Sequence, residues 1–492
     1  MKTRKITLTI LLGTVLLGLG SCSKFLEEDP KHVVNITNYY KTEQDAVSAV
    51  NAVYAYLNSI STGSTAGVYH STFWVAAGLA SDELVNNQLG TPQFDQLGTF
   101  TYGPQNAGLL EIWQMHYKTI TLANVAIERI PLIDMNSTLR SRLVGEAKFL
   151  RALMYFNMVR MFGKIPLMLK EEEPLRPNVA EVAAIYAQIH TDLEAAEADL
   201  PLSFAPGVGR GRATKGAAYA LNAKVYLTEK NWKQAAAKAK VVIDSKEYDL
   251  WDNYADAFKL ANRGGKEAVF SVGFGDKGGA IIFWEVGQFL VRLLPPQLSD
   301  AGVVNAQGWQ IPTQQLYDSY DAEDQRRAVT FITSITKTDG STITIRPYIQ
   351  KYWDRVAEPK GNESSQDFPV IRYSDVLLMY AEAMNEDDQS LIAHEYINKV
   401  RKRARFDGTT YRNTVPDYSG LGKDAFRAAV LKERRLELAV EGHRWFDMVR
   451  TNTLETLVPQ AKPGVVPAAR NYLFPVPLRE RELNTNLPSN GY

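Results

Sequence analysis

The sequence has almost no cysteine: Cys22 is the single one among 492 residues. One cysteine excludes a disulfide framework, a cysteine-based zinc site and an iron–sulfur cluster. An excess of charge of either sign is also missing, because 55 basic side chains balance 55 acidic ones. This balance argues against a nucleic-acid-binding protein, which needs a basic excess or a basic stripe to neutralise phosphates.

Common catalytic and metal-binding motifs are missing too. The 6 histidines are scattered, without HExxH or His-x-His spacing, and the chain has neither a GxSxG elbow nor a GxxxxGK[ST] phosphate loop. Residues 273–278 match GxGxxG, but no amphipathic helix follows to hold a pyrophosphate, so they predict a flexible glycine loop. Glu433, Glu437 and Glu441 stand among arginines at four-residue spacing, which favours a salt-bridged helix face over catalytic acids. These observations predict no enzymatic activity, no cofactor and no metal.

A long apolar run occurs only near the amino terminus. Lys2, Arg4 and Lys5 precede an uncharged apolar stretch over residues 6–18, which is shorter than the about 20 residues of a membrane-spanning helix. The stretch ends in small residues before Cys22, which resembles a bacterial lipobox with lipid attached to this cysteine. An ordinary signal peptide with a chance cysteine is the alternative. We therefore expect a signal peptide at residues 1–21, a lipidated linker at residues 22–41, and an exported protein tethered to a membrane by acyl chains.

Helical periodicity recurs along most of the chain. Apolar residues return every three or four positions, or helix formers dominate, in residues 42–60, 108–130, 138–162, 181–200, 212–227, 232–243, 374–383, 391–404 and 423–441. Residues 212–243 form an alanine-rich hairpin of about 33 residues that looks like a tetratricopeptide-type unit. The small residues allow its two helices to pack closely. The pattern predicts a mainly α fold of degenerate helical pairs.

Two regions break this periodicity. Residues 61–105 are rich in Gly, Ser and Asn, and we expect a long loop there, which is usually functional in a compact protein. Residues 263–367 read as an irregular insertion, with a strand at 268–274 and a hairpin of 329–335 with 341–346 that turns at Asp339-Gly340. The expected organisation is a helical region at 42–262, this insertion at 263–367, and a second helical region at 368–492.

Aromatic residues in these irregular regions are the candidate ligand-binding groups. Aromatic rings offer flat apolar faces to the C–H faces of sugars, while amides and carboxylates bind the hydroxyl groups, and no metal is needed. The candidate rings are Trp74, Phe283, Trp284 and Trp309, and the candidate hydroxyl partners are Asp82 and Gln88. The competing interpretation is that these rings pack the loops onto the helical body, and it is strongest for Trp309.

Short motifs occur in a characteristic order along the whole chain. They are Cys22 followed by FLEEDP at 25–30, SDE at 81–83, GEAKFLRA at 145–152, FGKIPL at 162–167, GRATKGAA at 211–218, VIRYSDVLL at 370–378, ERRLEL at 433–438, EGHRWFD at 441–447 and FPVP at 474–477. In this order they resemble the SusD/RagB family of surface lipoproteins from Bacteroidetes-type bacteria. None of these motifs is a ligand motif, so the candidate site residues depend on chemistry and position alone.

The resemblance implies both a fold and a function. The fold has four tetratricopeptide-like helical pairs that support a variable, loop-rich face with short β-hairpins. The function is capture of oligosaccharides, or of peptides in some branches, at the outer face of the outer membrane, without catalysis. The implied partner is a SusC-like TonB-dependent transporter. A surface glycoside hydrolase, which needs two carboxylates across a cleft, and a purely structural cap for the transporter are the remaining alternatives.

Overall fold

The computed structural model describes residues 40–58, 67–204, 209–275, 287–303, 305–355 and 364–492. Contacts divide the chain into residues 1–41 and 42–492, and the second unit is described below. Its α-helices are α3 (Glu43–Asn58), α4 (Thr72–Leu79), α5 (Pro92–Thr99), α6 (Ala107–Arg129), α7 (Ser137–Phe162), α8 (Val182–Asp199), α9 (Lys215–Thr228), α10 (Trp232–Ser245), α11 (Phe289–Leu293), α12 (Gln314–Asp318), α13 (Gln325–Thr330), α14 (Tyr373–Glu386), α15 (Ser390–Ala404), α16 (Lys423–Glu437), α17 (Arg444–Arg450), α18 (Leu454–Ala461) and α19 (Leu478–Leu483). Its strands are β1 (Leu84–Asn86), β2 (Ala268–Val272), β3 (Gln310–Pro312), β4 (Phe331–Thr336), β5 (Thr342–Ile349) and β6 (Phe368–Arg372). Short 3₁₀ helices are η2 (Ile130–Leu132), η3 (Tyr254–Phe258), η4 (Leu260–Asn262), η5 (Pro296–Ala301) and η7 (Ala469–Tyr472).

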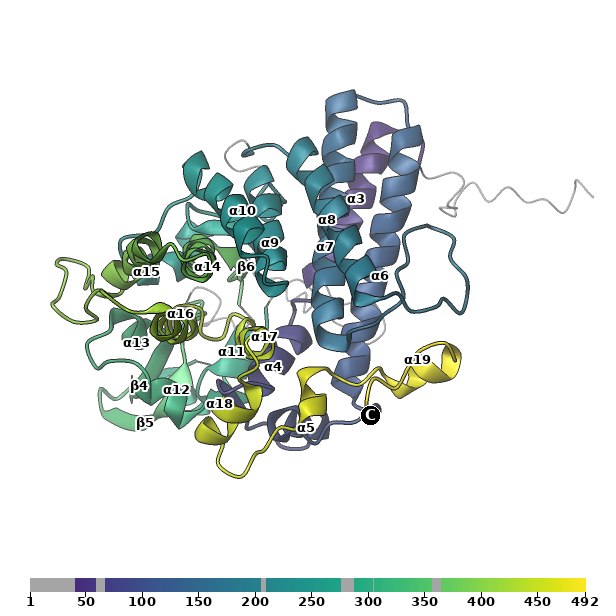
Figure 1. The fold of residues 1–492 in the computed structure, drawn as a ribbon. Coiled ribbons are helices and arrows are strands. Elements are labelled where there is room, and N and C mark those ends of the chain that lie inside the picture. Colours follow the sequence, from purple (N-terminus) through teal and green to yellow (C-terminus); the bar gives the residue numbers. More distant parts are fainter. Residues whose placement is uncertain (1–39, 59–66, 205–208, 276–286, 304, 356–363) are drawn as a thin grey trace, which may run out of the picture. The chain divides into compact units, whose positions relative to one another are not determined.

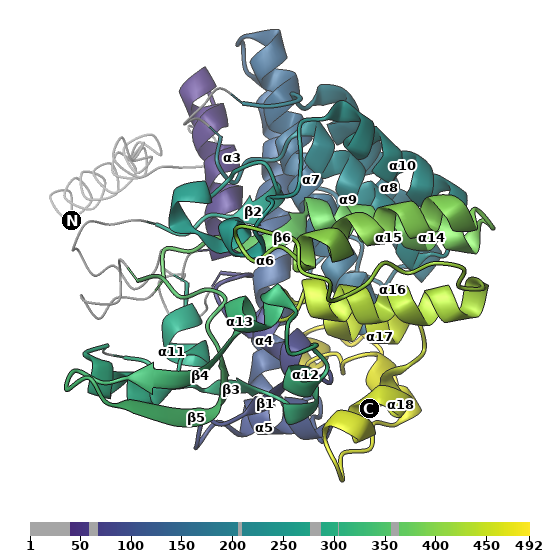
Figure 2. The same ribbon diagram turned by 90° about the vertical axis from the view of Figure 1, so that its left-hand side faces the viewer.

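The longer helices pack as pairs. The pairs are α3 with α6, α7 with α8, α9 with α10, and α14 with α15, and neighbouring pairs meet through α6–α7, α8–α9 and α10–α14. Both ribbon views show the strands β4 and β5 together with α11 and α12 to one side of this helical array, and Figure 2 shows β3 beside them (Figure 1 and Figure 2). The predicted mainly α fold of helical pairs with a loop-rich region is therefore confirmed.

The hairpin of α9 and α10 shows why the helical prediction succeeded. Thr214 caps α9 by accepting a hydrogen bond from the Ala217 N–H, and Asn231 caps α10 in the same way through the Gln234 N–H. Between the helices Lys230 adopts the left-handed conformation, with φ at +61°. The facing alanines are buried, namely Ala217, Ala220, Ala223, Ala235 and Ala239. Local caps and small residues thus specify the close pairing that the sequence predicts.

The strands of the described residues form two-stranded antiparallel sheets, β1–β3, β2–β6 and β4–β5. The β4–β5 hairpin and a strand at β2 confirm the predictions for the insertion. The other two sheets join distant segments, because Ala268 pairs with Arg372 and Asn86 pairs with Gln310. The insertion is therefore tied both to the carboxyl-terminal helices and to the segment after α4.

Two predictions about local structure are wrong. The region expected as a long loop at 61–105 contains α4, β1 and α5. All 8 residues of α4 are buried, so this helix has no polar face and no amphipathic period to reveal it. The helix expected at 423–441 ends at Glu437, because the backbone then turns through Val440 and Gly442, whose φ angles are +61° and +75°.

A group of buried charges lies where these segments meet. We call it the central ion cluster: Glu267, Asp324, Arg326, Lys351, Arg372, Arg401, Arg403, Glu433, Glu437 and Glu441. The sequence predicts a salt-bridged helix face for the 433–441 segment. Its glutamates do form ion pairs, but with cations of other segments and in the interior, where the side chains are at most 7% exposed. Arg372 contacts two of these acids at once, Glu437 at 3.0 Å and Glu441 at 2.8 Å. Burial by itself would raise the pKa of Glu437, but Arg403, Arg372 and the other cations lower it to about 2.

Replacing Arg372 with leucine tests the role of this cluster. The change leaves the carboxylates of Glu437 and Glu441 short of a buried counter-charge, which costs about 3–5 kcal/mol of stability. Urea unfolding followed by circular dichroism measures the loss. As a control, Lys240→Ala breaks an exposed pair with Asp244 and should cost about 0.5 kcal/mol or less. A loss for Arg372→Leu no larger than the control would contradict the structural role.

Candidate functional site

A partly exposed tryptophan, Trp309, lies just before β3 and beside the end of β1. The β1–β3 ladder continues past Asn86, because the Asn87 N–H donates to the Trp309 carbonyl at 2.7 Å. The Asn87 side-chain amide also donates to the Gly308 carbonyl at 3.0 Å. The structure therefore brings two of the predicted site residues, Gln88 and Trp309, to the same end of one ladder. Figure 2 shows the two strands of this ladder, β1 and β3, side by side. We call Trp309 with Asn87, Gln88 and Leu89 the Trp309 platform.

Arg292 of α11 packs against the ring of Trp309. The guanidinium carbon of Arg292 lies 5.3 Å from the ring centroid of Trp309 and 5.3 Å from that of Phe94. Its nitrogens donate to Gln288 at 2.7 Å, to Gln310 at 3.3 Å and to Ser71 at 3.3 Å, and the residue is 6% exposed. A cation fixed in this way stabilises the ring through a cation–π contact and sets its orientation.

The chain on either side of the platform is equally constrained. Gly308 has a φ of +58°, and a Cβ on it would lie 2.5 Å from the Tyr348 ring, so this position requires glycine. On the other strand the Asn86 amide donates to the carbonyl of Gln88 at 3.1 Å and to Asp95 at 2.7 Å. These contacts hold the platform in one shape before any ligand arrives.

The platform also offers polar groups. The side-chain carbonyl oxygen of Gln88 is buried and has no hydrogen-bond partner among the described residues, so it does not face a ligand. Asn87 is exposed, and Leu89 is 96% exposed. A partly exposed indole next to the exposed amide of Asn87 and an apolar side chain is suited to a sugar ring and its hydroxyl groups.

Trp74 lies in the core and not in a loop, contrary to the prediction. It belongs to α4, is 1% exposed, and packs against Phe289 and Phe368 with ring centroids 5.6 Å and 6.2 Å apart. The ring has no face left for a sugar, so the predicted stacking role of Trp74 is wrong for this structure. The sequence could not reveal this, since a wholly apolar helix next to a glycine-rich stretch has no periodic pattern.

Asp82 is buried as well, and it serves the fold. It is 1% exposed, and its two oxygens accept hydrogen bonds from Arg444 at 2.8 Å each. Arg435 lies 3.3 Å from the same carboxylate. Burial by itself would raise the pKa of Asp82, but Arg444 and Arg435 outweigh it and lower the pKa. Asp82 thus anchors the start of β1 to the carboxyl-terminal region and is not available to a ligand.

The remaining candidates lie outside the described residues. Phe283 and Trp284 fall in residues 276–286, and Cys22 falls in residues 1–39. The structure therefore leaves their predicted roles open. The same holds for the signal peptide and for residues 276–278, which are half of the GxGxxG match.

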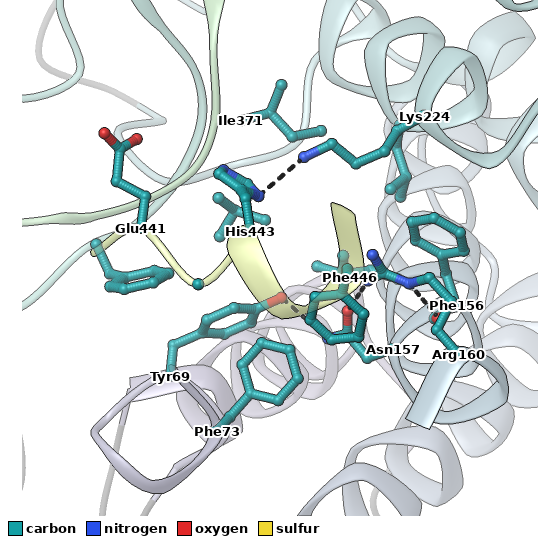
Figure 3. Close-up of a pocket in the computed structure, with 15 residues that line it drawn as sticks. Tyr69, Phe73, Phe156, Asn157, Arg160, Lys224, Ile371, Glu441, His443 and Phe446 are labelled. Atoms are coloured by element: carbon teal, nitrogen blue, oxygen red, sulfur yellow. Dashed lines mark hydrogen bonds between the residues drawn. The ribbon is translucent and has the colours of Figure 1, made fainter. Parts of the chain in front are cut away.

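Figure 3 shows an internal cavity of about 30 Å³ beside His443 and Lys224. The two side chains point toward each other, with Lys224 Nζ 3.3 Å from His443 Nδ1. Burial and the charge of Lys224 lower the pKa of His443 to about 3, so its imidazole is neutral. A volume of this size holds a water molecule or two and is far too small for a sugar.

Two larger grooves, of about 650 Å³ and 410 Å³, lie elsewhere on the surface. Among the described residues the larger groove is lined by one carboxylate, Glu247, and the smaller by none. A glycoside hydrolase needs two carboxyl groups about 5–9.5 Å apart across its cleft. The described lining of neither groove supplies that pair.

Replacing Asp82 with asparagine tests its anchoring role and its charge. At pH 7 the change should lower the free energy of unfolding by about 3 kcal/mol, because Arg444 loses its buried partner. The lowered pKa means that the Asp82 charge stabilises the fold at pH values above about 4, the unfolded pKa, and that this contribution is lost as pH falls through the folded pKa.

Denaturant titrations at pH 7, 5 and 3 measure this effect. The difference between the wild type and Asp82→Asn should be equal at pH 7 and 5 and smaller at pH 3. The exposed Asp95→Asn serves as the control. A difference that grows in acid would rule out the charged anchor.

Family models match both ends of the chain. A model described as "SusD family" matches residues 326–492, and one described as "Starch-binding associating with outer membrane" matches residues 24–227. Within the described residues, no helix has the length and apolar character to cross a bilayer.

Individual relatives match nearly end to end. A SusD-like protein of Formosa agariphila, designated P2, is 32% identical over 100% of this chain and 99% of its own. Among solved structures, a "Laminarin binding SusD-like protein" is 26% identical with a TM-score of 0.77, covering 92% of this chain and 100% of that one. A SusD superfamily protein of Parabacteroides distasonis is 25% identical with a TM-score of 0.78, covering 90% of this chain and 98% of that one.

Proposed function

The chain belongs to the SusD family, and from this premise we propose that it binds oligosaccharides without hydrolysing them. The observation that carries the proposal is the Trp309 platform, where a fixed and partly exposed indole lies across the strand pair from the exposed Asn87. The indole would stack on the C–H face of a sugar ring, and the Asn87 amide would form a hydrogen bond with a hydroxyl group. The similarity to a laminarin-binding protein supports a saccharide ligand and makes laminarin fragments natural first probes.

A rigid platform favours binding for a physical reason. Ordering a side chain on binding costs about 0.5–1.5 kcal/mol, and a preorganised ring avoids much of this cost. Arg292 and Gly308 already fix Trp309 before the ligand arrives. A modest contact area can then give useful affinity and still permit release.

We further propose that the protein hands its ligand to a SusC-like TonB-dependent transporter at the outer membrane. In this proposal residues 1–21 are removed as a signal peptide, Cys22 carries the lipid, and residues 22–41 link the anchor to the binding unit. The family description that mentions the outer membrane supports this location, and so does the lipobox-like sequence before Cys22. Residues 42–262, 263–367 and 368–492 would then form the exposed binding protein.

Replacing Trp309 with alanine tests the binding proposal. Isothermal titration against a panel of neutral oligosaccharides, with laminaritetraose among them, should identify a ligand of the wild type. The variant should bind that ligand at least about tenfold more weakly, a loss of about 1.4 kcal/mol. Trp232→Ala removes a partly buried tryptophan from α10 and should leave the affinity unchanged.

Three results would contradict the proposal. They are equal affinity of Trp309→Ala and the wild type, heat of binding with peptides but with no saccharide, and release of new reducing ends by the purified protein. The second result would instead support peptide capture, and the third a glycoside hydrolase.

Replacing Cys22 with alanine tests the anchor. Without the cysteine there is no thiol to acylate, so the full-length protein should move from the membrane fraction to the soluble fraction. Immunoblots of fractionated cells measure this, with a serine-to-alanine change at Ser23 as the control. Membrane retention of Cys22→Ala at the wild-type level would argue for another mode of attachment.

A further inference from the structure

The larger of the two surface grooves, with a volume of about 650 Å³, has the size of a ligand site and an unusual charge. It is lined by residues 202–204, 209–212, 214, 247–248, 263–266 and 268–271. It shares no residue with the Trp309 platform. We propose that this groove is a second saccharide site, specific for a sugar that carries sulfate or carboxylate groups.

The first argument is the balance of charge. Four cationic side chains line the groove, Arg210, Arg212, Arg263 and Lys266, and Glu247 is the one acid among the described lining residues. The whole chain has no net charge, so this excess is local. A groove of one sign concentrates ligands of the opposite sign and strengthens their binding.

The second argument is that two of these cations are weakly engaged by the protein. Arg210 lies 3.7 Å from Asp367, and its side chain is 38% exposed. Lys266 lies 3.5 Å from Asp249, and its side chain is 36% exposed. The buried pairs of the central ion cluster are tighter, as between Arg326 and Glu433 at 2.6 Å. Arg210 also donates to the Phe274 carbonyl at 2.9 Å, and Lys266 Nζ lies 5.1 Å from the centroid of the Trp251 ring. Arg210 and Lys266 thus have long ion pairs and partly exposed side chains, which an anionic ligand can contact.

A third cation is fixed in place. Arg212 contacts the fully buried Glu146 at 2.6 Å and also donates to Asn51. Its guanidinium lies 5.3 Å from the centroid of the Tyr54 ring. Arg212 therefore keeps positive charge at the junction of the two grooves, which both include residues 210–212.

The fourth argument is the exposed backbone of the groove. Gly209, Gly211, Gly264 and Gly265 line it, and the first three have φ angles of +94°, +76° and +64°. A Cβ on Gly211 would lie 3.3 Å from the carbonyl oxygen of Ser271 in β2. Because glycine has no side chain, a ligand can approach the main-chain amides of these residues closely.

These features together indicate the class of ligand. Planar guanidinium groups bind both sulfate and carboxylate oxygens in a forked geometry. The rings of Phe204 and Tyr248 add apolar surface for the body of a sugar. The inference that the ligand is a saccharide rests on the proposed function. The inference that the ligand is anionic rests on the groove alone.

The experiment measures binding of a sulfated carrageenan tetrasaccharide, of tetragalacturonate and of neutral laminaritetraose by isothermal titration in 50 mM NaCl. The wild type should bind at least one of the two anionic probes, and that binding should weaken several-fold in 200 mM NaCl. Arg210→Gln combined with Lys266→Gln should lower affinity for the anionic probe about tenfold. The same double change should leave binding of any neutral ligand unaltered.

A matched control removes equal charge elsewhere. Lys240→Gln combined with Arg412→Gln neutralises two exposed cations outside the groove, whose side chains are 43% and 47% exposed, and should bind like the wild type. Thermal unfolding of both double variants checks that each is folded. Trp309→Ala should keep its affinity for the anionic probe.

Several results would overturn the inference. They are absence of binding by both anionic probes, equal affinity of the groove and control variants, and displacement of the probe by sodium sulfate at concentrations as low as those of the tetrasaccharide. If the wild type still binds a neutral sugar and Trp309→Ala weakens that binding, the proposed function stands even where the charged groove fails its test. Failure of the wild type to bind any saccharide contradicts the proposed function itself.

Discussion

The fold depends on the central ion cluster, where ten charged side chains are taken out of water together. Among the described residues it contains five acidic and five basic members, so the cluster has no net charge. Its members come from β2, α13, β6, α15 and α16 and the segments that adjoin them. A buried ion pair is weak evidence for stability, but loss of one member is costly. The cluster therefore links the insertion at residues 263–367 to the helices of residues 368–492. An arrangement of these segments that separated the charges would be destabilised.

The Trp309 platform lies at the end of a second chain of fixed contacts. Arg444 and Arg435 hold Asp82, the β1–β3 ladder follows Asp82, and Trp309 ends that ladder. Asp82 and Leu84 at the start of this series are buried, whereas Val85 and Asn86 are partly exposed and Asn87 is exposed. The scaffold and the candidate site thus consist of different residues, and the β1–β3 ladder joins them.

The sequence predicted the helices far better than the candidate site. Helices such as α6 and α7 have caps and apolar stripes within a few residues of chain, so local patterns specify them. The ladders β1–β3 and β2–β6 join segments more than 90 residues apart, and no local pattern encodes such a pairing.

The tryptophans show the same limit. Trp74 and Trp309 both lie in stretches rich in glycine and amides, but one is 1% exposed and the other is partly exposed. Burial depends on which distant side chains arrive, here Phe368 for Trp74 and Arg292 for Trp309. Local sequence does not decide whether Trp309 packs the loop or binds a ligand. Gln88 was identified by chemistry alone, and its position beside Trp309 is a product of the tertiary fold.

The pairing of Asn86 with Gln310 also has a kinetic meaning. It closes a loop of more than 200 residues, and long loops carry a large entropic cost before their contacts form. The Trp309 platform lies at the end of this ladder, so its geometry exists only once these two distant segments have paired. A chain that has not completed this pairing lacks the platform.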